Sequence, residues 1–401
     1  GPLHRIFGVV KVQLESASGG KPEAIINVID LESVKELRAR VLQESEEDIT
    51  DSDKESSEIK KDSILKLNFL EIVRYGIITN RGLIAVAIFF GFVSQFIDDD
   101  NPRNIRAWLK STIFYVKDTV DSVIPETGTL STILFGLSFF VIALIVLWIL
   151  SIGMALLKFH EFDLTQNKGK LAASMGLLTR LQATIPMSRI QAITVHNSWL
   201  HKLFKRVGIT VETAGGVNTE QQGVTMKQIA PVIETSLQSA FLKEIQPDQE
   251  WGEISWSSIE AKAWRRVFKV SFLIGTLCSL TSLMHSYWAF GSLLLLVAVL
   301  SYLYSKAYVK RAGYHVTDEL AAFKSGVIFH KETYVRLTKV QTVRLKESMF
   351  DRRHKMAKLE LDTAGATVGA HHIDIPYISY ETANKLYQRI SNKVQNSAFE
   401  W

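Results

Sequence analysis

Residues 185–216 of the chain read IPMSRIQAITVHNSWLHKLFKRVGITVETAGG. Residues 335–366 read VRLTKVQTVRLKESMFDRRHKMAKLELDTAGA. The two stretches align without a gap, because every residue of the second lies 150 positions after its counterpart in the first. In each stretch, apolar and polar side chains alternate on both sides of a short basic segment, as in a strand with one buried face. The pattern predicts that one β-rich folding unit is present twice.

Each copy continues into a segment that we interpret as a helix. The first is MKQIAPVIETSLQSAFLKEI, residues 226–245, and the second is ISYETANKLYQRISNKV, residues 378–394. Shorter alternating pieces precede the quoted stretches, at 160–186 and 313–337. Each unit is therefore predicted to consist of several short strands closed by one helix.

A third, partial copy opens the chain. GPLHRIFGVVKVQLESASG, residues 1–19, aligns with the second halves of the two quoted stretches. A closing helix is expected over 30–44, with Asp30 as its N-cap. We therefore expect the chain to begin in the middle of a unit. Residues 45–62 are charged, rich in serine and almost free of large apolar side chains, which predicts a disordered acidic linker.

Four strongly apolar segments separate the units. They lie at 81–97, 130–157, 267–284 and 287–305. A helix needs about 20 apolar residues to cross the hydrocarbon core of a bilayer. The four segments therefore predict two pairs of transmembrane helices, and the alternative for each is a buried core helix. Residues 64–80 predict an amphipathic helix that leads into the first span.

The charges beside the apolar segments indicate an orientation. Nine basic residues near the ends of the spans lie on one predicted side: Arg74, Arg81, Lys158, Lys262, Arg265, Arg266, Lys306, Lys310 and Arg311. Because cytoplasmic flanks are enriched in lysine and arginine, the β-rich units are predicted to be cytoplasmic. Loop 98–129 is then expected outside.

Composition and motifs give little support to catalysis. The chain has 401 residues, a net charge of +5 and a single cysteine, Cys278, so it can form no internal disulfide. It contains no GxxxxGK[ST], HExxH, GxSxG or paired CxxC motif. In HHID, residues 371–374, His372 and Asp374 share a strand face and could begin a metal site, but polar residues on an edge strand are the simpler interpretation. No nucleic-acid reader motif is present.

The chain resembles the bacterial membrane proteins with pleckstrin-homology-like (PH-like) domains, in particular the three-domain YdbT-like group. The resemblance is carried by IPMSRIQAITV at 185–195, LHKLFKRVGITVETAGG at 200–216 and PLHRIFGVVKVQLESASGG at 2–20. It implies a seven-stranded, strongly bent sheet capped by a C-terminal helix, and two further spans before the first domain. The third unit departs most, with Arg336 in place of Pro186.

Two sets of residues are candidate sites. The basic residues that form candidate contacts with the membrane surface or a partner are Lys202, Lys205, Arg206, Arg352, Arg353, Lys355 and Lys358. The alternative for this set is a solvated basic face. The residues interpreted as structural markers of the repeat are Phe7, Gly19, Gln191, Phe204, Gly215, Gly216, Gln341 and Gly365.

The predicted fold class is an α+β membrane protein, in which repeated PH-like β-sandwich or barrel domains, each closed by a C-terminal helix, alternate with transmembrane helix pairs. The predicted segments are 1–44, the C-terminal part of a first PH-like domain; 45–62, the linker; 63–157, an amphipathic helix and a span pair; 158–248, the second PH-like domain; 249–305, a linker and a span hairpin; and 306–401, the third PH-like domain.

The predicted function is a non-enzymatic scaffold in the bacterial plasma membrane. Its cytoplasmic PH-like domains would assemble with each other or with a partner. The resemblance implies as partner a small YdbS-like membrane protein with one such domain, and a role in envelope stress, including resistance to antimicrobial peptides. The lipid bilayer, including anionic headgroups, is the other expected partner; no cofactor and no nucleic acid are expected. The alternative is a transporter or lipid-handling protein.

Overall fold

The computed structural model describes most of the chain from residue 128 onward. The described segments are 9–14, 24–30, 63–79, 128–167, 169–214, 227–247, 254–279, 287–363 and 372–396, with isolated residues between them. The predicted span at 81–97, the linker at 45–62 and most of loop 98–129 lie outside the described residues. The same holds for five predicted repeat markers: Phe7, Gly19, Gly215, Gly216 and Gly365. The contacts divide the chain into two compact units, one of residues 1–65, 163–174 and 181–401 and the other of residues 66–162 and 175–180.

The partial copy at the start of the chain forms a two-stranded antiparallel sheet. Its strands are β1 (Val9–Leu14) and β2 (Ala24–Asp30). The carboxylate of Asp30 accepts a hydrogen bond from the backbone N–H of Ser33 at 3.2 Å, which is the contact expected of an N-cap. The closing helix predicted over 30–44 lies mostly outside the described residues.

The smaller unit contains a pair of packed helices, α4 (Phe69–Thr79) and α7 (Gly128–Phe159). Gly76 makes the close approach possible, because a Cβ there would lie 2.6 Å from the Cα of Ile152. The hydroxyl of Ser151 donates a hydrogen bond to the carbonyl of Gly76 at 2.6 Å. The sequence predicts a helix over 64–80. In the structure this helix, α4, begins at Phe69, because residues 63–66 form a strand.

The first strands of the second PH-like copy form a four-stranded sheet in the order β3-β4-β5-β6. Its strands are β3 (Ser63–Lys66), β4 (Asp163–Asn167), β5 (Lys170–Met175) and β6 (Leu181–Pro186). The hydroxyl of Ser63 donates to the carboxylate of Asp163 at 2.7 Å, across β3 and β4. In the chain, β3 therefore precedes the apolar segments 81–97 and 130–157, and its neighbour β4 follows them.

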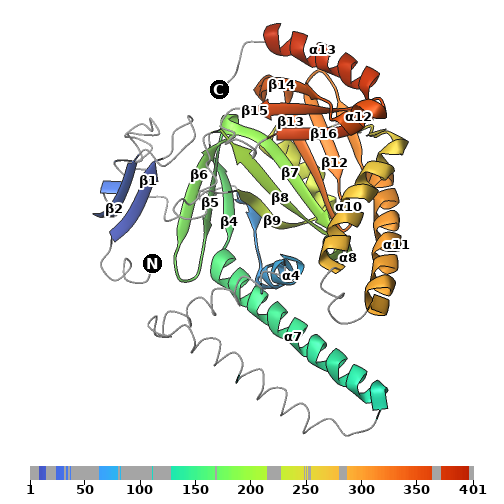
Figure 1. Cartoon of the computed structure of the whole chain (residues 1–401). Coiled ribbons are helices and arrows are strands. Elements are labelled where there is room, and N and C mark those ends of the chain that lie inside the picture. The colour runs from blue at the N-terminus through green and yellow to red at the C-terminus, as the bar shows by residue number, and fades with distance from the viewer. Residues whose placement is uncertain are drawn as a thin grey trace, which may run out of the picture. The chain divides into compact units, whose positions relative to one another are not determined.

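A seven-stranded sheet combines strands of the second and third copies, in the order β10-β11-β12-β13-β7-β8-β9. Figure 1 labels five of these strands, β12, β13, β7, β8 and β9. The strands of the second copy are β7 (Ile190–Ser198), β8 (Arg206–Thr213) and β9 (Gln228–Glu234). Those of the third copy are β10 (Ser257–Ser258), β11 (Gly313–Val316), β12 (Leu320–Ser325) and β13 (Phe329–Arg336). The alternation in the quoted stretches predicts β7 and β8 but does not reveal this shared sheet.

The remaining strands of the third copy form a separate sheet, β14-β15-β16, against which α13 packs. These elements are β14 (Val340–Lys346), β15 (Met356–Thr363), β16 (His372–Ser379) and α13 (Tyr380–Asn396). Leu359, Leu361 and Ile375 are fully buried there, and Ala383 and Ile390 of α13 join the same core. Burial of such side chains is the dominant favourable term in folding.

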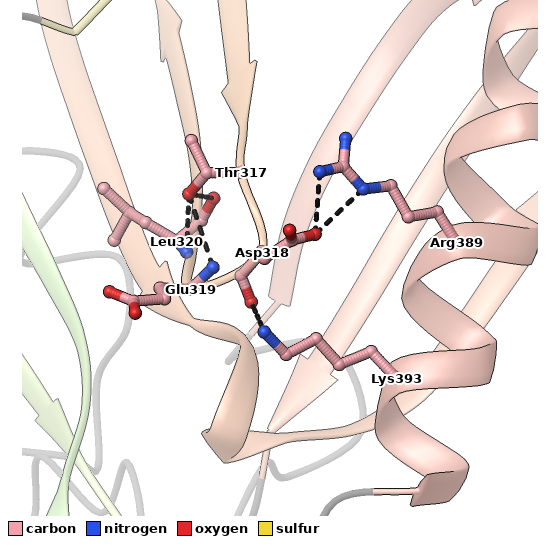
Figure 2. A network of polar contacts seen from close by, with 6 residues as sticks. All are labelled: Thr317, Asp318, Glu319, Leu320, Arg389 and Lys393. Atoms are coloured by element: carbon pink, nitrogen blue, oxygen red, sulfur yellow. Dashed lines mark hydrogen bonds and ion pairs between the residues drawn. The ribbon is translucent and has the colours of Figure 1, made fainter.

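Polar contacts hold α13 to the turn between β11 and β12 (Figure 2). The carboxylate of Asp318 accepts hydrogen bonds from Nε of Arg389 at 2.9 Å and lies 2.7 Å from Nη2. Lys393 donates to the backbone carbonyl of the same aspartate. The hydroxyl of Thr317 accepts from the N–H of Leu320 at 3.1 Å and so closes the turn. The helix predicted over 378–394 is confirmed by α13.

The helix predicted over 226–245 is wrong in its first half. Residues Gln228–Glu234 form β9, and the helix α9 covers only Gln238–Ile245. Ile229, Ala230 and Val232 are all buried, so consecutive side chains on both faces of the strand are covered. A strand buried on both faces lacks polar alternation and can be mistaken for a helix.

A second helix pair, α10 (Trp264–Ser279) and α11 (Tyr287–Arg311), lies in the chain between β10 and β11. Within the described part of the chain, two helical stretches are long and apolar enough to cross a membrane: Val141–Phe159 and Gly291–Arg311. Only 11% of each stretch is buried within the protein. This exposure does not fit the alternative of buried core helices.

Candidate assembly interface

The strands β7 and β13 join the second copy to the third. They pair antiparallel over seven residues, from Phe329 opposite Ser198 to Val335 opposite Ala192. In the middle of the ladder the hydroxyls of Thr194 and Thr333 lie 3.1 Å apart and share a hydrogen bond. Ala192 belongs to the hydrophobic core of the third copy. The two copies therefore share an interface of backbone pairing, a side-chain hydrogen bond and core packing, and the strands pair in one register.

A polar cluster on β13 combines the buried Tyr334 with the half-buried His330 and Glu332. The hydroxyl of Tyr334 donates to the carboxylate of Glu332 at 2.6 Å, and Nε2 of His330 lies 3.3 Å from the same carboxylate. Burial raises the pKa of Glu332, but the hydrogen bonds from His330 and Tyr334 outweigh it and leave that pKa below its usual value. The ring of Trp251, from the segment between the two copies, packs edge-on against Tyr334.

The equivalent strand of the third copy is β14, and it is the outermost strand of its sheet in the described structure. Gln191 in β7 is 3% exposed, whereas its counterpart Gln341 in β14 is exposed. Thr194 is buried, but its counterpart Arg344 is exposed. The same strand position is thus covered by β13 in one copy and lies open in the other. In the second copy, the counterpart of β13 is β6, which is also an outermost strand of its sheet among the described residues.

Short helices follow β7 and β14, and each begins with a capping box. In α8 (Trp199–Leu203) the hydroxyl of Ser198 lies 2.8 Å from Nδ1 of His201. In α12 (Met349–Arg353) the carboxylate of Asp351 replaces the imidazole and binds Ser348. Burial and, to a smaller extent, the nearby His196 together lower the pKa of His201 to about 4. The neutral imidazole therefore serves as a cap.

Most of the basic candidate residues are exposed near these short helices. Lys202, Lys205, Arg352, Arg353 and Lys355 are exposed, and Arg206 is half-buried. Two of them also shape the backbone, because Lys205 and Lys355 have φ values of 51° and 55° just after α8 and α12. Phe204, a predicted marker of the repeat, is the half-buried C-cap of α8. The structure brings these residues together at two equivalent places, 150 positions apart.

Lys358 differs from the other basic candidates. Its ammonium lies 2.5 Å from the carboxylate of Asp374 and 2.9 Å from that of Glu360. These partners raise the pKa of Lys358, although burial opposes them. Its charge is therefore balanced within the third copy, unlike the charges of the exposed basic candidates.

The HHID segment leads into β16, where Asp374 forms the ion pair with Lys358. Among the described residues, no group of three or more histidine, cysteine, aspartate or glutamate side chains is arranged to hold a metal. His371 lies outside the described residues. The interpretation as polar residues on an edge strand agrees with the outermost position of β16.

The comparison with known families decides the family. Residues 115–240 and 266–394 each match the family described as the bacterial PH domain. The chain belongs to the bacterial PH domain family. Each matched range of this bacterial PH domain protein ends within a closing helix, α9 or α13, as the repeat predicts.

One relative extends the similarity over most of this bacterial PH domain protein. The chain is 23% identical over 370 residues to the UPF0699 transmembrane protein YdbT of Bacillus subtilis (strain 168). The alignment covers 89% of the chain and 71% of the relative. No solved structure matches the chain. The resemblance to YdbT-like proteins with PH-like domains is thereby confirmed.

Sequence reasoning missed the junction of β7 and β13 and the open edge of β14. A signal was present in the composition of the two strands. The second copy has IQAITV where the third has VQTVRL, so an arginine in the third copy replaces a small residue in the second. A strand covered on both edges tolerates such a charge poorly, whereas edge strands often carry charged side chains.

Proposed function

We propose that this protein is a non-enzymatic membrane scaffold whose PH-like units assemble by adding strands edge to edge. The observation that carries the proposal is the continuous ladder between β13 of one copy and β7 of the preceding copy. Strand addition to an open edge supplies main-chain hydrogen bonds, and the side chains set the register. Within the segments that the structure describes, the second and third copies are joined in this mode once.

The open edge of β14 is the proposed site for a partner. By analogy with β7, it would accept the third strand of another PH-like unit, the counterpart of β6 or β13. Applying the register of the β13–β7 ladder to β6 of a second unit places Arg180 opposite Glu347 and the small Ala183 opposite Arg344. Opposite charges and a small residue beside a long one are favourable cross-strand pairs.

The partner proposed from the family resemblance is a small YdbS-like membrane protein with a single PH-like domain. The role proposed for the assembly is resistance of the cell envelope to stress, including membrane-active peptides. The relative's name describes a transmembrane protein, and α7 and α11 each contain a stretch long enough to span a bilayer. We propose that the PH-like units are cytoplasmic, because the basic residues that flank the apolar helices lie at the ends that lead into these units.

Photo-crosslinking in native membranes tests the proposal. A photoreactive amino acid replaces Arg344 in β14, and crosslinked peptides are identified by mass spectrometry. We expect the captured peptide to come from the third strand of a PH-like unit, in a second protein or a second copy. The matched control replaces Lys385, an exposed residue of α13 that forms an ion pair with Glu381 on the same helix. Equal capture at both positions, or capture of unrelated peptides alone, would overturn the assembly proposal.

A second candidate function, lipid handling, is favoured by one cavity. A space of about 540 Å³ lies between α10 and α11, and Tyr377 of β16 contributes to its lining. The residues that line it include four with hydroxyl groups: Ser271, Ser301, Tyr304 and Tyr308. A volume of this size fits a small ligand or part of a lipid.

Native mass spectrometry of the gently extracted protein distinguishes the two functions. A co-purifying protein with one PH-like unit would favour the scaffold. A single chain that carries a defined lipid, and loses it in a Ser301→Phe variant, would favour lipid handling. The Ser292→Phe variant, also on α11 but not among the residues that line the cavity, is the control.

A further inference from the structure

Three short segments of the third copy and its junction expose large apolar side chains outside the long helices. They are the hairpin between β12 and β13, α8 and α12. Their exposed apolar residues, which we call the apolar rim, are Trp199, Leu203, Ile328, Phe329, Met349 and Phe350. Phe329 is 77% exposed and Met349 is 82% exposed. Folding of the PH-like units does not account for side chains left so open to solvent.

The hairpin is bonded to the end of α11. Nη1 of Arg311, the last residue of that helix, donates a hydrogen bond to the carbonyl of Val327 at 2.6 Å. The N–H of Trp199 donates to the carbonyl of Ile328 at 3.0 Å, which joins α8 to the same hairpin. The β12–β13 hairpin and α8 are therefore both held at the C-terminal end of α11, which carries Lys310 and Arg311.

The third segment is held at the start of α10. The guanidinium of Arg266 lies 4.8 Å from the ring centre of Phe350, and the ammonium of Lys269 lies 5.8 Å from it. Arg266 also lies 3.9 Å from the carboxylate of Asp351. Since α10 begins at Trp264, these contacts fix α12 beside its first turns.

The second copy repeats part of this arrangement within the smaller compact unit. The N–H of Leu177 donates to the carbonyl of Leu157 at 3.0 Å, and Gly176 donates to His160 at 2.9 Å. These contacts bond the β5–β6 hairpin to the last turns of α7. Leu177 and Leu178, the counterparts of Val327 and Ile328, are exposed there. An exposed apolar hairpin at the end of a long apolar helix is thus present in both copies.

We propose that the apolar rim inserts into the boundary between the headgroups and the acyl chains of the bilayer. Tryptophan and phenylalanine beside basic residues are typical of segments that lie in this boundary. Lys202, Arg352 and Arg353 lie on the same short helices and are exposed, so they would meet the headgroups while the apolar side chains reach deeper. The occupant of the surface is the lipid bilayer. The rim would fix the height and tilt of each PH-like unit on the membrane.

This inference rests on the proposed membrane insertion but not on the proposed assembly. The test uses the full chain with Cys278→Ser, reconstituted in vesicles of phosphatidylethanolamine and phosphatidylglycerol. Single cysteines at Trp199, Phe329 and Met349 carry a fluorescent label. A spin-labelled lipid, with its nitroxide just below the headgroup, quenches labels at that depth. Lys385 on α13 is the exposed control, and Leu295 on α11, which is 71% exposed, is the control within the span.

We expect the spin-labelled lipid to remove most of the fluorescence at the three rim positions and little at Lys385. If Leu295 is quenched but the rim positions behave like Lys385, the rim does not touch lipid and the inference fails alone. If Leu295 is not quenched either, the proposed membrane insertion fails with it. A label at the rim that is shielded from water without being quenched would show that another protein surface covers it, which also overturns the inference.

Discussion

The hydroxyl of Thr194 lies 3.1 Å from the hydroxyl of Thr333, although the two residues belong to different copies of the repeat. The contact sits at the centre of the only ladder that joins the two copies in the described part of the seven-stranded sheet. This pair of strands is therefore a direct backbone connection between the two copies. The register of the ladder can be tested directly.

Cysteines at Thr194 and Thr333 should form a disulfide in the Cys278→Ser background. Residues directly opposite in an antiparallel pair have Cα atoms about 4.5–5.5 Å apart, within the range that a disulfide spans. The bond is detected by mass spectrometry of the oxidised full chain. The control pair, Thr194→Cys with Glu332→Cys, places the second thiol on the opposite face of β13. Equal yields for the two pairs would show that the register is wrong.

Gly76→Ala should weaken the packing of α4 on α7. The added Cβ would lie 2.6 Å from the Cα of Ile152, so the helices must move apart. We expect a loss of about 1–3 kcal/mol, as for other overpacked sites. Gly153→Ala is the matched control, because a Cβ there has no neighbour within 4 Å. Thermal unfolding in detergent should separate the two variants, and equal midpoints would contradict the close approach.

Stability should depend on pH through the cap of α8. Burial and His196 lower the pKa of His201 to about 4 in the folded chain, whereas an exposed histidine titrates near 6.5. Between these values the unfolded chain binds a proton that the folded chain does not. The contribution of His201 to the free energy of unfolding is therefore complete above pH 6.5 and is lost as the pH falls toward 4.

The variant His201→Asp isolates this effect, because Asp351 already fills the same capping position in the third copy. Unfolding midpoints of both proteins are measured from pH 7 down to pH 5. We expect the midpoint of the unchanged protein to fall more steeply than that of the variant. Parallel curves would mean that His201 does not titrate as described.

Removing the ion pair between Asp318 and Arg389 should cost little. Both side chains are more than half exposed, and exposed pairs contribute about 0.2–1 kcal/mol. A double-mutant cycle with Asp318→Asn and Arg389→Gln measures the coupling by chemical unfolding of the full chain. A coupling well above this range would show that the turn and α13 form a stronger anchor than their exposure implies.

The sequence predicts the local parts of the fold better than their combination. The period-two pattern predicts β8 and β15, and helical spacing predicts α13. The pairing of β13 with β7 joins residues about 140 positions apart, and no local pattern encodes such a partner. The strand β10 has only two residues, too few for any periodicity to show.

The candidate site shows the same limit. Basic side chains near α8 and α12 can be recognised from the sequence, because the two copies align. That Lys358 is neutralised by Asp374 and Glu360 depends on the pairing of β15 with β16, which only the folded chain reveals. The apolar rim is hidden for a similar reason, since Trp199 and Phe329 look like ordinary core residues until their exposure is known.

The position of the α10–α11 pair between β10 and β11 sets an order of events during synthesis. The ribosome releases β10 before the two helices, and its neighbour β11 follows them. This edge of the sheet cannot close until both helices have been made and brought back together. The same order applies to β3 and β4 around the earlier helices. Each of these two sheet edges can therefore close only after the helices encoded between its two strands have been synthesised, so the sheets are completed late in synthesis.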